Sequence, residues 1–254
     1  MLLEQTIEKL AHMKLHGMAR SLKDRVSRPD HGDLSITDFV GFLVDDEWME
    51  RQNRKLASRL RLARFKDVGA CPENVDYQTA RGLKKTVLLE LMQNHWLAKH
   101  QNIVLTGPAG SGKSYIAQAL GNHLCRSGFA VTYFRVPKLV FLLTQIRADG
   151  SYLRVMSRIA KARVLILDDL GIGALEEPVR TDFLEILEDR YGQGSTIITS
   201  QLPTKAWHEY FGSGIVADGI CDRFLHNAHR IDLNAKESLR KSKSTLTEQE
   251  GSGK

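Results

Sequence analysis

The segment GPAGSGKS at residues 107–114 constrains the fold more than any other part of this 254-residue chain. It matches the pattern GxxxxGK[ST] at every fixed position, and an apolar run at 103–105 comes directly before it. After it, apolar residues recur at helical spacing from Ile116 to Leu124. A glycine-rich loop between a strand and a helix points backbone N–H groups at phosphate oxygens, and the helix N-terminus adds positive charge. The sequence therefore predicts an α/β fold with a phosphate-binding loop.

The cofactors that this loop predicts are ATP and Mg²⁺. Lys113 is expected to reach the β- and γ-phosphates, and Ser114 is expected to give its hydroxyl oxygen to Mg²⁺. The predicted nucleotide-binding residues are Gly107, Pro108, Ala109, Gly110, Ser111, Gly112, Lys113, Ser114 and Tyr115.

A second motif, VLILDD at residues 164–169, lies about 55 residues after the loop. Four apolar residues predict a strand buried on both faces, and the two carboxylates then emerge at its carboxyl end, where ligands bind in open α/β sheets. Asp168 is predicted to hold Mg²⁺ through water, and Asp169 to orient or deprotonate the attacking water. An acid pair that merely begins a turn is the structural alternative.

Five short apolar strand candidates alternate with helical stretches from about residue 86 onward. They lie at residues 102–106, 130–134, 164–167, 196–200 and 229–233. This alternation predicts a parallel, right-handed, doubly wound sheet.

Residues 1–66 are predicted to be all helical, with apolar positions at helical spacing from Leu3 to Leu22 and a second helix capped by Thr37. Residues 67–86 look like a connector, and the polar residues 241–254 are expected to be disordered. The predicted domains are a helical N-terminal region at 1–66, a nucleotide-binding core at 67–240 and a tail at 241–254. The three tryptophans, Trp48, Trp96 and Trp207, are predicted to be packing anchors.

Seven basic residues and no acidic one lie between Arg51 and Lys66. Together with the net charge of +6, this predicts contact with the phosphate backbone of DNA. A solvated face, or pairing with the acidic residues at 45–50, is the alternative. The three cysteines form no pair or metal-ligand cluster, the first residues do not resemble a signal peptide, and no apolar run would span a membrane. A cytoplasmic protein is expected.

At this point the chain resembles the AAA+ ATPases of the DnaC/DnaA-like branch, and most of all the IstB-like ATP-binding helpers of insertion-sequence transposition. The resemblance covers nearly the whole chain. It is carried by the segments NIVLTGPAGSGKSYIAQALG, RVLILDDLG, STIITSQLP, ICDRFLHNAHRIDL and ESLRK.

The resemblance implies roles for further residues. Thr199 and Ser200 end the strand where such proteins keep a polar sensor of the γ-phosphate, and Ser200 is the predicted one. Arg223 resembles the arginine finger that reaches the ATP of a neighbouring subunit, with Arg230 as its competitor, and Arg240 resembles a second sensor. A surface salt bridge is the alternative for each arginine.

Two departures from the general AAA+ pattern stand out. Asp169 occupies a position that usually holds Glu, and the shorter side chain predicts slow hydrolysis. Only about 20 residues follow the last predicted strand, too few for the usual helical lid domain. The predicted fold is therefore a P-loop AAA+ core with a five-stranded parallel sheet, without a full C-terminal lid, after a small all-helical N-terminal domain.

The predicted function is a DNA-stimulated ATPase that helps transposition. Its expected partners are double-stranded DNA, the transposase of the same element and further copies of the chain, with ATP sites between subunits and no membrane. A DnaC-like helicase-loading ATPase is the alternative from another functional class. A small-molecule P-loop kinase is a third, which would require neither the basic N-terminal segment nor an arginine finger in trans.

Overall fold

The computed structural model describes residues 2–27, 34–77, 82–148 and 150–234. Contacts divide the chain into two compact units, Met1–Arg59 and Leu60–Lys254. The division falls inside α3 (Ile36–Ala63), a helix of 28 residues. The predictions for Arg240, for the tail at 241–254 and for the missing lid concern residues outside the described part of the chain.

The first unit contains α1 (Leu3–His12), α2 (His16–Val26) and the first part of α3. The periodic pattern from Leu3 to Leu22 predicted no interruption, and this was wrong. The chain breaks between the two helices at Lys14, whose φ of 61° lies in the left-handed region. The structure therefore has two helices in a segment where the apolar periodicity continues and predicts one.

The N-terminus of α2 lies on α3 with no space between the two backbones. A Cβ on Gly17 would lie 2.7 Å from the Asp46 carbonyl oxygen and from the Glu47 Cα. The buried Glu47 carboxylate accepts hydrogen bonds from the N–H groups of Gly17 (2.8 Å) and Met18 (3.2 Å). These N–H groups have no partner inside α2, so Glu47 fastens one helix to the other.

The first turn of α3 is capped by Ser35 and not by the predicted Thr37, which lies inside the helix. The Ser35 Oγ accepts the Asp38 N–H at 3.1 Å, and the Ser35 carbonyl accepts the Phe39 N–H. This is the hydrogen-bonding pattern of a serine N-cap.

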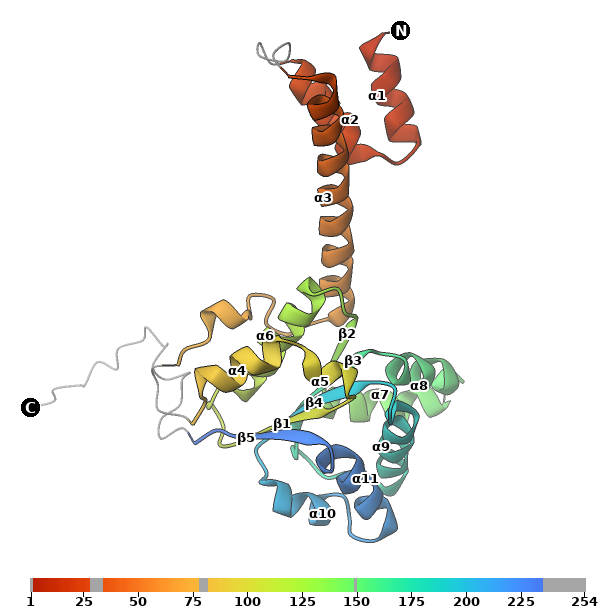
Figure 1. The fold of residues 1–254 in the computed structure, drawn as a ribbon. Helices are drawn as coiled ribbons and strands as arrows, with labels where there is room; N and C mark the ends of the chain where they lie inside the picture. The colour runs from red at the N-terminus through yellow and green to blue at the C-terminus, as the bar shows by residue number, and fades with distance from the viewer. Residues whose placement is uncertain (1, 28–33, 78–81, 149, 235–254) are drawn as a thin grey trace, which may run out of the picture. The chain divides into compact units, whose positions relative to one another are not determined.

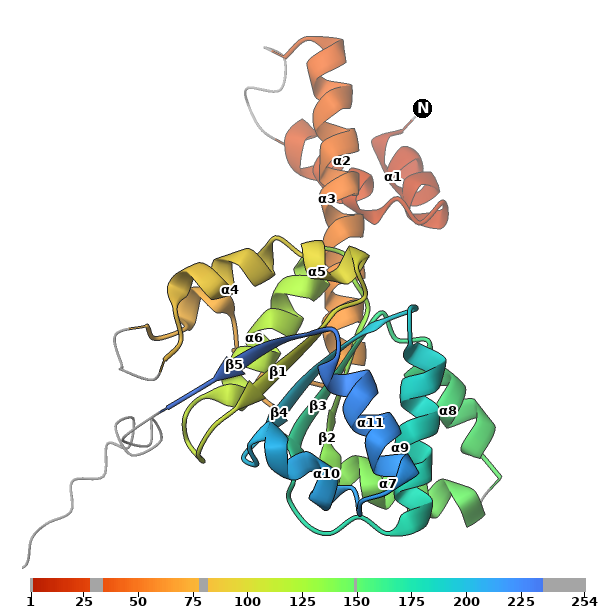
Figure 2. The ribbon, with the colours of Figure 1, turned by 60° about the horizontal axis from the view of Figure 1, so that its bottom comes forward.

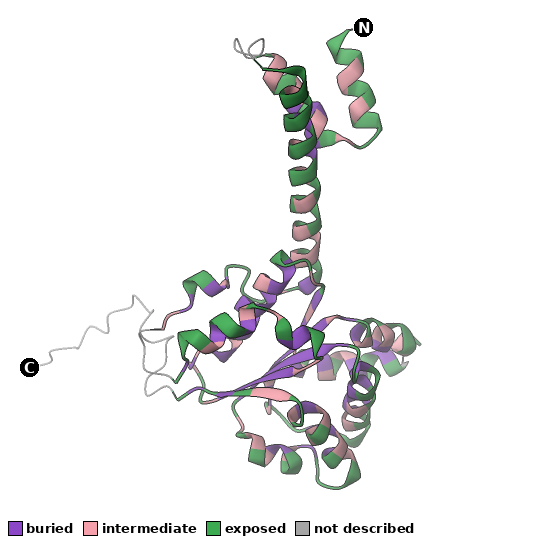
Figure 3. Cartoon of the chain, viewed as in Figure 1, coloured by how far each residue is buried: buried purple, intermediate pink, exposed green. Residues whose placement is uncertain are grey.

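Two of the three predicted tryptophan anchors are buried and one is not. Trp96 and Trp207 are 3% and 0% exposed, whereas Trp48 on α3 is 64% exposed, so the prediction was wrong for Trp48. Figure 3 shows the predominantly exposed surface of the first unit.

The second unit is built on a five-stranded parallel sheet in the order β2-β3-β4-β1-β5, as Figures 1 and 2 show. All five predicted strands are present. Their bounds are Asn102–Thr106 (β1), Val131–Arg135 (β2), Val164–Leu170 (β3), Ser195–Ser200 (β4) and Ala228–Asp232 (β5). Every residue of β1 and β4 is buried, as expected for strands covered by helices on both faces.

Helices cover both faces of this sheet (Figure 2). On one face, α6 packs so closely that a Cβ on Gly121 would lie 2.7 Å from the Cδ1 of Ile166. The other face carries an apolar cluster, which joins strand residues such as Val104 and Leu165 to α7, α8, α9 and α11. The helices are η2 (Pro72–Asn74), α4 (Lys85–Met92), α5 (His95–Ala98), α6 (Lys113–Arg126), α7 (Val136–Ala148), α8 (Tyr152–Ala160), α9 (Glu177–Arg190), η3 (Thr204–Ala206), α10 (Trp207–Tyr210) and α11 (Ile215–Leu225).

Across the residues that the structure describes, no helix combines the length and apolar character needed to cross a membrane.

Candidate functional site

The glycine-rich segment forms a tight loop between β1 and the N-terminus of α6. Gly107, Gly110 and Gly112 have φ angles of 142°, 78° and 91°, which L side chains rarely adopt. At Gly107 there is a second constraint, because a Cβ would lie 2.1 Å from the Leu233 carbonyl oxygen just after β5. The loop therefore takes its curl from glycine, and the end of β5 closes over its first residue.

Lys113 begins α6, and its side chain folds back into the loop. Its Nζ donates to the carbonyl oxygens of Gly107 and Pro108, both at 2.7 Å, and the residue is 6% exposed. The ammonium group is thus held on the inner side of the curl by neutral acceptors. A phosphate oxygen is a stronger acceptor for an ammonium group than a carbonyl is, so an anion entering the loop would compete for it.

Ser114 and Tyr115 follow on the first turn of α6, and both are partly buried. Burial raises the pKa of the Tyr115 hydroxyl, and a hydrogen bond with the backbone of Cys71 acts in the opposite direction. Tyr115 thus contacts the segment before α4, which is a contact that the sequence did not predict.

Asp168 is 1% exposed and accepts two hydroxyl hydrogen bonds. Tyr133 Oη on β2 donates at 2.7 Å, and Thr199 Oγ1 on β4 donates at 2.5 Å. Burial, followed by the charge of Asp168, raises the pKa of Tyr133, so its hydroxyl stays protonated and remains a donor. The carboxylate is held between the two neighbouring strands, and Tyr133 is a neighbour of the acid pair that the sequence analysis missed.

Asp169 leaves the line of the strand. Its φ is 64°, and the register between β3 and β4 shifts between Leu167 and Leu170. Such a bulge re-aims side chains, and here the Asp169 carboxylate meets Arg135 at the end of β2, with Nη2 to Oδ2 at 2.8 Å. The hydrogen bond to Asp169 raises the pKa of Arg135. Arg135 is the second residue at this site that the sequence analysis missed.

The polar pair at the end of β4 divides into two environments. Thr199 Oγ1 donates to Asp168 and accepts the Asp169 N–H at 2.9 Å. Ser200 Oγ instead donates to the Leu170 carbonyl at 2.8 Å and accepts the Leu202 N–H at 3.0 Å. The hydroxyl that contacts the acid pair is therefore that of Thr199, while the hydroxyl of the predicted sensor, Ser200, contacts backbone.

Strand register brings these groups to one edge of the sheet. The Cα partner of Thr106, which precedes the loop, is Ser200, and Ser200 also pairs with Leu170. The loop, Thr199 and the acid pair thus lie at the carboxyl ends of three adjacent parallel strands, where open α/β sheets bind ligands. The described residues hold no group of three or more His, Cys, Asp or Glu side chains suited to a metal ion. The oxygens of Ser114 and Asp168 suit Mg²⁺, which usually binds proteins through one or two side chains and takes its other ligands from phosphate and water.

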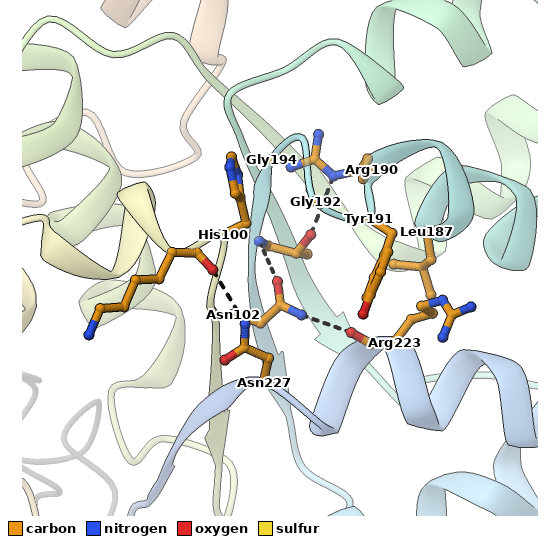
Figure 4. A pocket seen from close by; sticks show the side chains of 11 residues that line it. His100, Asn102, Leu187, Arg190, Tyr191, Gly192, Gly194, Arg223 and Asn227 are labelled. Atoms are coloured by element: carbon orange, nitrogen blue, oxygen red, sulfur yellow. Dashed lines mark hydrogen bonds between the residues drawn. The ribbon is translucent and has the colours of Figure 1, made fainter.

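Arg223 lies at the other edge of the sheet. Its carbonyl oxygen accepts a hydrogen bond from the Nδ2 of Asn102, the first residue of β1 (2.9 Å). Its side chain lines a cavity of 220 Å³ at the amino ends of β1 and β4, shown in Figure 4. The structure therefore does not bring Arg223 to the loop of its own chain. Arg230 lies on β5, and its Nη2 donates to the Leu225 carbonyl at 2.9 Å.

The same cavity is bordered by Arg190, which is 2% exposed. Its guanidinium donates to the carbonyl oxygens of Ala162 (2.6 Å) and Ser195 (2.5 Å). Burial lowers the pKa of Arg190 to about 10. These contacts join the end of α9 to the strands, and Arg190 has a structural role.

Comparisons with known proteins agree with these features. A family model described as IstB-like ATP binding protein matches residues 8–247. The insertion sequence ATP-binding protein y4pL of Sinorhizobium fredii is 47% identical over 95% of this chain and 98% of its own length. The corresponding protein of insertion sequence IS1162 from Pseudomonas fluorescens is 39% identical over 80% of this chain and 88% of its own length.

Solved structures share the fold at low sequence identity. AMPPCP-bound DnaA from Aquifex aeolicus has a TM-score of 0.58 at 19% identity, covering 69% of this chain and 53% of that one. The DnaI structure has a TM-score of 0.55 at 22% identity, covering 70% and 93%. The DnaC helicase loader has a TM-score of 0.52 at 19% identity, covering 58% and 86%.

Proposed function

Because this chain belongs to the IstB-like ATP binding protein family and has a P-loop AAA+ core, we propose that it is an ATP-dependent helper of insertion-sequence transposition. In this proposal it assembles on double-stranded DNA with ATP and hydrolyses ATP to ADP and phosphate. The observation that supports it most is the shared edge of the sheet, where the loop after β1, which contains Lys113, and the acid pair of β3 lie on either side of β4.

The loop would hold the triphosphate and Lys113 would neutralise it. In the structure the Lys113 Nζ donates to the carbonyl oxygens of Gly107 and Pro108, and a phosphate oxygen would compete with these acceptors for the ammonium group. Ser114 and Asp168 would hold Mg²⁺, whose charge offsets the charge of the phosphates. Asp168 enters this arrangement already oriented by Tyr133 and Thr199.

Asp169 would orient the attacking water or take its proton. Arg135 contacts the Oδ2 atom of this carboxylate through both Nε and Nη2, so the pair would hold the orientation in which Asp169 meets the water. Thr199 is the better placed sensor, because its hydroxyl contacts Asp168 directly. Ser200, the residue chosen from the sequence, remains the alternative.

Arg223 would act on the nucleotide of a neighbouring subunit. It lies at the amino-terminal edge of the sheet, opposite its own phosphate loop, so it can stabilise phosphoryl charge only in another copy of the chain. This supports a homo-oligomer with ATP sites between subunits. Arg230 remains the competing finger, and Arg240 remains a proposed second sensor outside the described residues.

The partners follow from the family and from charge. Relatives named for insertion sequences favour double-stranded DNA and the transposase of the same element over the replicative helicase that a DnaC-like loader would bind. The exposed basic residues Arg54 and Lys55 of α3 supply charge for phosphate contact. Binding of purified transposase, compared with binding of a replicative helicase, distinguishes the two functions.

Replacing Lys113 tests the proposal. Lys113→Ala should lose nucleotide-dependent assembly on DNA, measured as the mass of the complex with ATP·Mg and duplex DNA. Lys205→Ala, at an exposed position in η3, is the matched control and should assemble normally. ATP-dependent assembly that survives in Lys113→Ala would refute the proposed function.

A further inference from the structure

The guanidinium of Arg223 is held in two different ways, by its flat face and by its edge. Its Cζ lies 4.6 Å from the ring centroid of Tyr191, directly over the ring. At the edge, Nη1 lies 2.7 Å from Asp222 Oδ2 and Nη2 lies 3.1 Å from Glu188 Oε1. A cation–π contact uses the face, whereas hydrogen bonds to oxygens use the edge, so one can persist while the other changes.

The backbone below this side chain is fixed to the sheet. Asn102 Nδ2 donates to the Arg223 carbonyl at 2.9 Å, and Asn102 Oδ1 accepts the Thr196 N–H at 2.9 Å, a bridge visible in Figure 4. Asn102 thereby joins the end of α11 to β1 and β4. These hydrogen bonds hold the Arg223 backbone to the sheet.

The edge contacts are incomplete. Among the described residues, Arg223 Nε is buried without a hydrogen-bond partner, although the side chain as a whole is 29% exposed. Asp222 and Glu188 are themselves about half exposed, so water competes for both ion pairs. Replacing these two ion pairs by hydrogen bonds to a phosphoryl group therefore costs little free energy.

Tyr191 directly follows a residue that is anchored to the sheet. It follows the last residue of α9, whose Arg190 is buried and bound to strand carbonyls. Tyr191 is 62% exposed in spite of its contact with Arg223, and it borders the 220 Å³ cavity. Figure 4 shows its ring beside Arg223.

We propose that Tyr191 is a positioning residue for Arg223. Its ring supports the face of the guanidinium while the edge exchanges Glu188 and Asp222 for phosphoryl oxygens of the neighbouring subunit's nucleotide. This inference rests on the proposed role of Arg223 in trans. It assigns no chemical step to Tyr191, whose hydroxyl is not needed, so phenylalanine should substitute for it.

A subunit-mixing experiment tests the role of Arg223 in trans and the positioning role of Tyr191 separately. Arg223→Ala subunits keep an intact ATP site but offer no finger, and Asp169→Asn subunits offer a finger but lack the proposed water-orienting group. Mixing them should restore ATP turnover above that of either variant alone. If mixing restores nothing, the finger in trans is wrong and the role of Tyr191 falls with it.

The second arm replaces Asp169→Asn with the double variants Asp169→Asn/Tyr191→Ala and Asp169→Asn/Tyr191→Phe. The alanine variant should lower kcat of the mixture roughly two- to thirtyfold with KM for ATP unchanged, and the phenylalanine variant should not. Equal turnover in all mixtures, or equal loss with alanine and phenylalanine, would overturn the positioning role. Tyr191→Leu, which keeps apolar bulk without a ring face, replaces the alanine variant if that one does not fold.

Discussion

Arg135 and Asp169 form an ion pair between the ends of β2 and β3, with 2.8 Å between Nη2 and Oδ2. The pair places a guanidinium on the carboxylate proposed to activate water. Arg135 Nε also donates to the same oxygen at 2.9 Å, so both contacts fix the orientation of this carboxylate. The pair therefore restrains the proposed catalytic group in the resting chain.

Removing this restraint should be visible in the rate. Arg135→Ala is expected to lower ATP turnover in the absence of DNA about fivefold, which corresponds to about 1 kcal/mol for a partly exposed pair. Arg135→Lys keeps a positive charge and is the control. Steady-state phosphate release measures the effect. Turnover that rises in Arg135→Ala would show that Arg135 restrains hydrolysis.

The two hydroxyls at the end of β4 can be separated by substitution. Thr199→Val removes the hydroxyl that contacts Asp168 and should lower kcat about 10²-fold, the usual cost of losing one oriented donor in an active site. Ser200→Ala should lower it much less, because Ser200 contacts backbone. Steady-state phosphate release at saturating ATP compares them. The reverse order of effects would restore Ser200 as the sensor.

The two candidate fingers can be compared in the same way. Arg223→Ala should bind ATP normally and lose hydrolysis by about 10³-fold, as expected when an arginine finger is removed. Arg230→Ala should retain turnover, because it lies on β5 and contacts the Leu225 carbonyl. A fluorescent ATP analogue reports binding and phosphate release reports turnover. Normal turnover in Arg223→Ala would remove that residue from the mechanism.

DNA contact by α3 predicts a change in salt dependence. Replacing the exposed residues Arg54 and Lys55 by alanine should weaken binding to unrelated duplexes equally. It should also reduce the slope of log affinity against log salt by about 2. Arg51→Ala is the control, because Arg51 is already paired with Glu47 at 2.7 Å. An unchanged slope in the double variant would assign these residues to a solvated face.

Glu47 should make the first unit sensitive to acid. Burial acts to raise its pKa, but hydrogen bonds from Arg51 and from the N–H groups of Met18 and Gly17 lower it below the ordinary 4.5. A lowered pKa in the folded state means that this stabilisation is present above pH 4.5 and is lost as the pH falls through the folded-state value.

Hydrogen exchange of the α2 amides measures this contribution. Protection should decrease in acid, and Glu47→Ala should cost about 1–3 kcal/mol at neutral pH by leaving buried N–H groups unpaired. In Glu47→Gln the acid dependence should flatten. A wild-type pH profile in that variant would locate the sensitivity elsewhere.

The sequence by itself determined the five strands, the phosphate loop and the acid pair. Each depends on neighbours along the chain: apolar runs, glycines that allow the curl, and carboxylates directly after a strand. Local pattern also failed in places. Lys14 interrupts a helical periodicity, Ser35 caps where Thr37 was expected, and Trp48 is exposed.

Only the tertiary structure decided which residues surround the acids. Strand order placed β2 beside β3, so Tyr133 reaches Asp168 and Arg135 reaches Asp169. Strand pairing brought Thr199, not Ser200, to the acid pair, and Arg223 lies at the opposite edge of the sheet. These contacts join strands that are distant along the chain, and their geometry depends on packing across the whole sheet, which local residue patterns do not specify.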